Sequence, residues 1–177
     1  TTSSSQSLVI EVVMLDAGAC NEYDLGLALA QCSCGVGTPY CQPNANSTGQ
    51  ASSIVAAGSI VAAANDVTLS VQDLPSGAAC LFLVSDTQAF IPNPGGSEGN
   101  LCLGGGIGRY AGPGQVMVSS ASGSVSLTID LTQVPTPFGP SMTDPGDTWN
   151  FQLWHRDVDG GSIPTSNFSN ARTITFQ

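Results

Sequence analysis

The sequence has no lysine, and its three basic residues are Arg109, Arg156 and Arg172. Charged residues make up 9% of the 177-residue chain, and 13 acidic side chains give it a formal net charge of −10 at pH 7. Phosphate groups are bound by clustered lysine and arginine side chains, so this composition argues against nucleic-acid binding. Attraction to an anionic membrane surface is disfavoured for the same reason.

Long apolar segments are also missing. No apolar run reaches the roughly 20 residues that a membrane-spanning helix needs, so we expect no membrane insertion. The chain starts at Thr1 without an initiator methionine or an apolar signal stretch, which is typical of a mature protein after removal of a signal peptide. We therefore expect a secreted protein that acts outside the cell or at the cell surface.

Helix-forming residues are scarce. Glutamate occurs only at positions 11, 22 and 98, whereas the chain has 21 glycines and 11 prolines. These numbers exclude long helices. Solubility has to come from serine, threonine, asparagine and glutamine, which suit the surface of a β-sheet.

Strand patterns begin clearly at Asp66–Leu74, where Val67, Leu69 and Val71 alternate with polar residues. Further strands are expected at residues 79–84, 115–119, 124–131, 148–156 and 172–176. Eight or nine strands separated by Pro/Gly turns predict an all-β fold, an antiparallel β-sandwich of jelly-roll-like type. Composition and hydrophobic patterning divide the chain into three parts. They are a tail and strand at 1–19, a Cys/Gly-rich cross-linked segment at 20–51 and the sandwich at 52–177.

The cysteine count is even, and in a chain of extracellular character it predicts three disulfides. The six residues are Cys20, Cys32, Cys34, Cys41, Cys80 and Cys102. Zinc binding is disfavoured because the closest pair is a C-x-C and the one histidine is more than 100 residues away. Spacing favours Cys80 with Cys102 on adjacent strands, and the other four cysteines would then staple the N-terminal extension internally.

Several motifs in the second part of the chain occur together and in a fixed order. They are FIPNPGG at 90–96, NLCLGG at 100–105, IGRY at 107–110 and GDTWNFQLWHRD at 146–157. Residues 66–177 therefore resemble a C-terminal module of secreted planctomycete-type proteins. The resemblance implies an extracellular β-domain and supplies no catalytic residues.

No catalytic motif is found. His155 with Asp157 or Asp159 and a serine could be read as a hydrolase triad, but the chain has no G-x-S-x-G turn. Most acidic residues lie at turns, where carboxylates hydrogen-bond to nearby backbone, so an acid pair for glycoside hydrolysis is also disfavoured. The sequence predicts a protein that is not an enzyme.

Two kinds of ligand have candidate residues. Asp157 and Asp159 begin an oxygen-rich loop and Asp144 and Asp147 flank a turn, which makes these four carboxylates candidates for calcium, although the EF-hand spacing is absent. Trp149, Phe151 and Leu153 are expected in the core. Trp154 falls on the opposite strand face, and with Tyr110 it is the candidate platform for stacking a carbohydrate, the alternative being an aromatic that covers a loop.

The N-terminal segment carries the main functional hypothesis. An apolar run of strand-forming residues consists of Leu8, Val9, Ile10, Val12, Val13, Met14 and Leu15. It is either an edge strand of its own sandwich or a strand donated to a neighbouring copy, and repeated donation would build a filament. We therefore expect a structural extracellular protein that polymerises with itself, with a monomeric carbohydrate-binding module as the alternative.

Overall fold

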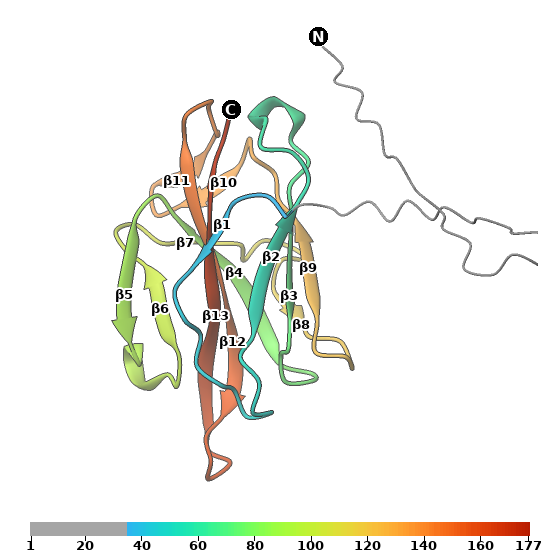
Figure 1. The fold of residues 1–177 in the computed structure, drawn as a ribbon, viewed down its shortest axis with the longest axis vertical. Coiled ribbons are helices and arrows are strands. Elements are labelled where there is room, and N and C mark those ends of the chain that lie inside the picture. The colour runs from blue at the N-terminus through green and yellow to red at the C-terminus, as the bar shows by residue number, and fades with distance from the viewer. Residues whose placement is uncertain (1–34) are drawn as a thin grey trace, which may run out of the picture. The chain divides into compact units, whose positions relative to one another are not determined.

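The computed structural model describes residues 35–177, and Figure 1 shows their arrangement. The described residues belong to one compact unit, Ser33–Gln177. The strands are β1 Thr38–Tyr40, β2 Ser53–Ala57, β3 Thr68–Gln72, β4 Ala79–Ser85, β5 Gln88–Pro92, β6 Asn100–Leu103, β7 Gly108–Arg109, β8 Met117–Val118, β9 Val125–Thr128, β10 Val134–Thr136, β11 Gly139–Ser141, β12 Thr148–Val158 and β13 Pro164–Thr175. Within these residues the only helical elements are the 3-10 turns Ala62–Ala64 and Pro94–Gly96.

Every pair of neighbouring strands is antiparallel. The larger sheet has the order β1-β13-β12-β4-β7, with β8 also paired to β4, and the smaller sheet has the order β2-β3-β9. Figure 1 shows β2, β3 and β9 in one layer and β13, β12 and β4 in another. Side chains from both sheets share one buried core, which confirms the predicted all-β antiparallel sandwich.

The alternating patterns predicted the inward-facing residues correctly. Val67, Leu69 and Val71 are all fully buried. In β12, Phe151 and Leu153 are fully buried and Trp149 is 8% exposed, as a strand with one face on the core requires.

The structure differs locally from the predicted strands, and β13 begins eight residues before the strand expected at 172–176. The strand expected at residues 115–119 is reduced to β8, because the Gln115 amide donates to the Gly112 carbonyl and closes a turn there. The structure also contains the β10–β11 hairpin, for which no strand was predicted, and in it Pro135 lies opposite Pro140. In an antiparallel pair, every second pair of opposite residues exchanges no backbone hydrogen bonds. Proline, which lacks an amide hydrogen, can occupy both strands at such a pair.

The compact unit includes part of the segment assigned to 20–51. β1 extends the larger sheet by pairing with β13, Thr38 lying opposite Thr173. Next to this pair the guanidinium of Arg172, which is 7% exposed, donates to the carbonyls of Val36 and Gly37. A buried cation satisfied by backbone oxygens fixes the start of the unit against β13.

The predicted disulfide between Cys80 and Cys102 is wrong. Cys102 bonds to Cys41, with 6.3 Å between the Cα atoms, and Cys80 is a buried free thiol whose pKa is raised to about 11 by burial. Cys80 faces the core between the sheets, whereas β6 packs on the other face of the larger sheet, so the sheet separates the two sulfurs. The disulfide instead ties the N-terminal segment to the sandwich. The other three cysteines, Cys20, Cys32 and Cys34, lie outside the described residues.

Candidate functional site

The two aromatic residues expected to form a sugar platform are not brought together. Tyr110 is 1% exposed and belongs to the core between the sheets, where its hydroxyl has no hydrogen-bond partner and burial raises its pKa. Trp154 is half-buried on the opposite face of the larger sheet. The prediction of a joint Trp154–Tyr110 platform is therefore wrong, because β7 leads directly into Tyr110 and its amide bonds to the Phe82 carbonyl of β4, which directs the ring inward.

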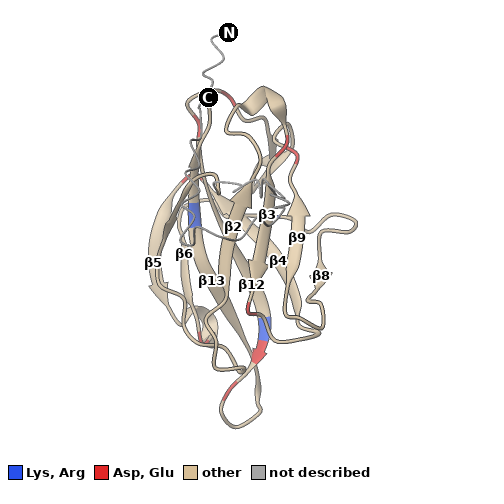
Figure 2. Cartoon of the chain, turned by 45° about the vertical axis from the view of Figure 1, so that its right-hand side comes forward, with Lys and Arg blue, Asp and Glu red and all other residues tan. Residues whose placement is uncertain are grey.

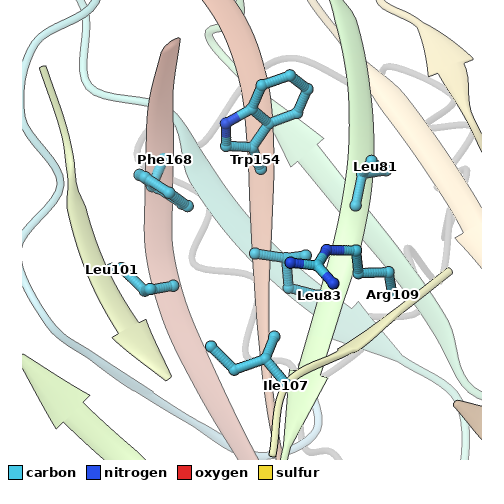
Figure 3. A pocket seen from close by; sticks show the side chains of 7 residues that line it. All are labelled: Leu81, Leu83, Leu101, Ile107, Arg109, Trp154 and Phe168. Carbon is cyan, nitrogen blue, oxygen red and sulfur yellow. The ribbon is translucent and has the colours of Figure 1, made fainter. Parts of the chain in front are cut away.

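Trp154 belongs instead to an apolar groove on the outer face of the larger sheet, which we call the outer groove. Its volume is about 360 Å³. It is lined by Leu81, Leu83, Leu101, Ile107, Arg109, Trp154 and Phe168. Figure 3 shows these side chains converging, with Trp154 at one end and Ile107 at the other. Six of the seven residues are apolar, so the groove suits an apolar partner.

The outer groove is built by strands from distant parts of the sequence. Leu81 and Leu83 come from β4, Trp154 from β12 and Phe168 from β13, and together they form its floor. Leu101 of β6 forms one wall. Leu83, Leu103 and Phe168 are buried beneath, while the remaining apolar residues of this cluster are only partly buried. The hairpin β5–β6 thus covers part of the outer face and leaves the rest open.

The side-chain amide of Gln152 holds β6, the wall of the outer groove, in place by hydrogen bonds. The Gln152 side chain is fully buried, and its Oε1 accepts from the Cys102 amide at 2.9 Å. Its Nε2 donates to the carbonyls of Asn100 and Ser169, both at 2.8 Å. Because each buried donor and acceptor has a partner, β6 is fixed at a defined distance from the sheet.

Positive charge gathers at the outer groove. Arg109 is exposed, and Figure 3 shows its guanidinium extending over Leu83 toward the middle of the groove. Arg156 is exposed as well and lies over the Trp154 ring, 5.2 Å from the ring centroid. Arg172 is buried, so among the described residues both solvent-facing arginines lie at or beside the groove. In Figure 2 most of the coloured positions are red, in keeping with the excess of acidic over basic residues.

The carboxylates predicted for calcium are arranged for structural roles. Asp157 is 7% exposed and accepts from the amides of Ser47 and Val158 and from the Asn167 side chain. Burial alone would raise the pKa of Asp157, but these hydrogen bonds outweigh it and hold that pKa below the ordinary value. The Asp157 carboxylate therefore joins the loop around Ser47 to β12 by a hydrogen bond.

The other predicted calcium residues are turn residues. Asp159 accepts from the amides of Gly161 and Ile163, both at 2.8 Å, and Asp147 accepts from the Asp144 amide at 2.8 Å. Asp157 and Asp159 also line a polar cleft of about 630 Å³ together with Glu98. Within residues 35–177, no three His, Cys, Asp or Glu side chains are placed to hold a metal ion.

His155 is not accessible from solvent. Its ring is fully buried, with Nδ1 at 3.0 Å from the Arg156 carbonyl and Nε2 at 3.4 Å from the Ser52 hydroxyl. A carbonyl can only accept, so Nδ1 carries the proton and Nε2 accepts from Ser52. Burial lowers the pKa of His155, which keeps the ring neutral. In a hydrolase triad, the histidine Nδ1 donates a hydrogen bond to a carboxylate. In this structure Nδ1 of His155 donates to the Arg156 backbone carbonyl instead.

The sequence interpretation missed most of the outer groove, although one signal for it is present. In β4, Cys80, Phe82 and Val84 face the core while Leu81 and Leu83 face outward. A strand that is apolar on both faces indicates that both faces are covered. The assembly residues Leu8 to Leu15 lie outside the described residues.

Comparison with protein-family models, with curated proteins and with solved structures finds no match to this chain. The resemblance to the planctomycete-type module therefore stays a prediction. None of the described residues forms a helix long and apolar enough to cross a membrane.

Proposed function

We propose that the protein is a non-enzymatic extracellular structural subunit, whose copies assemble into a filament when the apolar run Leu8–Leu15 of one copy binds to the next. The observation that carries this proposal is the outer groove, a hollow on the outer face of the larger sheet whose apolar lining is only partly buried. A second, apolar run in the same chain is the natural partner for such a surface, because burying both removes them from water.

The disulfide and the composition support a location outside the cell. Cys41–Cys102 joins residues 61 positions apart, and such bonds persist in oxidising compartments. The polar surface uses serine and threonine in place of charge. In β3 and β9 the hydroxyls of Thr68 and Thr128 are 2.9 Å apart, and those of Ser70 and Ser126 are 2.7 Å apart.

The sandwich also has an edge that is not protected against pairing. Among the described residues, β9 pairs with β3 on one side, and no loop or strand bonds to its other backbone edge. β9 has no lysine, proline or bulge, the features that proteins use to prevent edge-to-edge association. An unguarded edge is tolerable in a protein that is meant to assemble.

The test compares the full-length protein with a variant lacking residues 1–15 by negative-stain electron microscopy. We expect filaments from the full-length protein and isolated particles from the variant, with the sandwich still folded by circular dichroism. A variant lacking only residues 1–6, which keeps the apolar run, is the matched control and should form filaments. Isolated particles from the full-length protein at high concentration would contradict the proposal.

A carbohydrate-binding module is the second candidate, and the position of Trp154 at the end of the outer groove favours it. Arg156 already lies over the Trp154 ring, so a sugar would have to stack on the face that remains. Binding on a glycan array that is lost in Trp154→Ala would support this function. Binding that is unchanged in that variant would count against it.

A further inference from the structure

We propose that the outer groove is the acceptor site for the Leu8–Leu15 run of a second copy, and that Arg109 binds Glu11 of that run. This inference rests on the proposed function and names the contact by which assembly occurs. The groove lining and the run each combine several apolar side chains with one charged residue, and the two charges are opposite.

The apolar match explains why the groove would accept this segment. Leu81, Leu101 and Ile107 are only partly buried, so they keep apolar surface that a peptide could cover. A volume of about 360 Å³ has room for a few side chains of an extended peptide. Among residues 1–34, the run Leu8–Leu15 is the longest apolar segment, and Glu11 is its only charged residue.

The charge match makes the pairing specific. Glu11 is the one ionisable residue within the run, and Arg109 is the one ionisable residue in the groove lining. A net charge of −10 makes most contacts between two copies repulsive. The groove, with Arg109 in it and Arg156 beside it, is where a carboxylate of another copy would be attracted.

Extended geometry fixes which side chains enter the groove. In a strand, residues two apart point to the same side at intervals of about 6.7 Å, so Val9, Glu11 and Val13 share one side. With the Glu11 carboxylate on the Arg109 guanidinium, the two valines flank it and contact the leucines of β4. Guanidinium and carboxylate form paired hydrogen bonds, which sets the register of the bound segment.

The chain is long enough to reach a neighbour. The 20 residues from Leu15 to Gly35 span at most about 70 Å when extended. Donation from each copy to the next is heterologous, so it continues into a filament unless rotation closes a ring.

The open edge of β9 is one competing acceptor within the sandwich. Its side chains alternate between Ser126 and Thr128, which face solvent, and the partly buried Leu127. That edge offers backbone hydrogen bonds but neither a cavity nor a positive charge. The outer groove therefore fits the run better, and the two acceptors are separable by mutation.

The experiment is a charge exchange in the full-length protein, read by light scattering and negative-stain microscopy. Arg109→Glu and Glu11→Arg should each raise the concentration needed for filaments by at least about tenfold, since a charge-assisted hydrogen bond is replaced by repulsion. The double variant restores the pair with reversed charges and should regain filaments. Arg156→Glu, which changes the same net charge beside the groove, is the matched control and should have a smaller effect.

The outcomes separate this inference from the proposed function. If filaments disappear on removal of residues 1–15 but persist in both single variants, donation stands and the groove is not the acceptor. If the wild-type protein forms no filaments, both proposals are overturned. A wild-type monomer whose N-terminal run becomes sensitive to chymotrypsin only in Arg109→Glu would place the run in its own groove and overturn the inference.

Discussion

The two faces of the larger sheet differ in how they are completed. The inner face, with Phe82, Phe151 and Leu153 fully buried, packs against the smaller sheet in one continuous core. The outer face is covered by the β5–β6 hairpin, which is held by the Gln152 hydrogen bonds and the Cys41–Cys102 disulfide and leaves the outer groove open. The inner face is thus closed by the second sheet, whereas the outer face keeps apolar side chains that are only partly buried.

The largest effect is expected from the bond that fastens the outer layer. Replacing Cys41 and Cys102 by serine together should lower the free energy of unfolding by about 4 kcal/mol, the loop-closure value for residues 61 positions apart. Urea denaturation measures this loss. Cys80→Ala, which removes a thiol outside any disulfide, is the control and should cost about 1 kcal/mol. A smaller loss in the double variant than in the control would contradict the disulfide assignment.

A matched pair of leucine substitutions compares the two faces directly. Leu153→Ala on the inner face should lower the free energy of unfolding by about 3 kcal/mol, because it leaves a cavity in the core. Leu101→Ala in the partly open groove should cost about 1 kcal/mol. Urea denaturation gives both values, and filament assembly should respond in the opposite order. Equal losses of stability would show that the outer face is packed as tightly as the inner one.

The polar link across the outer layer is tested at Gln152. Gln152→Leu leaves a buried amide and two carbonyls without their partners, which should cost about 2 kcal/mol. Gln133→Leu, at an exposed position, should leave the free energy of unfolding nearly unchanged. Thermal unfolding followed by circular dichroism compares the two variants. A null effect at Gln152 would mean that the hairpin is held by other contacts.

The smallest effect concerns pH. His155 has a lowered pKa in the folded protein, so below about pH 6.5 the unfolded chain takes up the proton first. The free energy of unfolding should therefore be highest above that pH and fall as the pH drops through the lowered value. In His155→Gln this part of the pH dependence should vanish, as urea titrations between pH 5 and 8 would show. An unchanged pH profile would point to other groups, including Asp157, whose lowered pKa acts only below about pH 4.

The fold was predictable because it depends on local alternation, whereas most of the site was not. Val67, Leu69 and Val71 reveal the inner face of β3 from sequence alone. Trp154 was correctly assigned to the face opposite the core, yet its partner Tyr110 was not, since the direction of a single aromatic residue outside a long strand has no periodic signal.

Sequence by itself determined the class of the protein: all-β, poor in cations, built of alternating strands and cross-linked by cysteines. Those properties follow from composition and from a period of two, which need no knowledge of distant neighbours. The tertiary structure alone decided that Cys102 bonds to Cys41 and that Leu81, Leu101 and Arg109 border one groove. Such groupings depend on which strands pair and which face a hairpin covers, and these are long-range choices that no local pattern specifies.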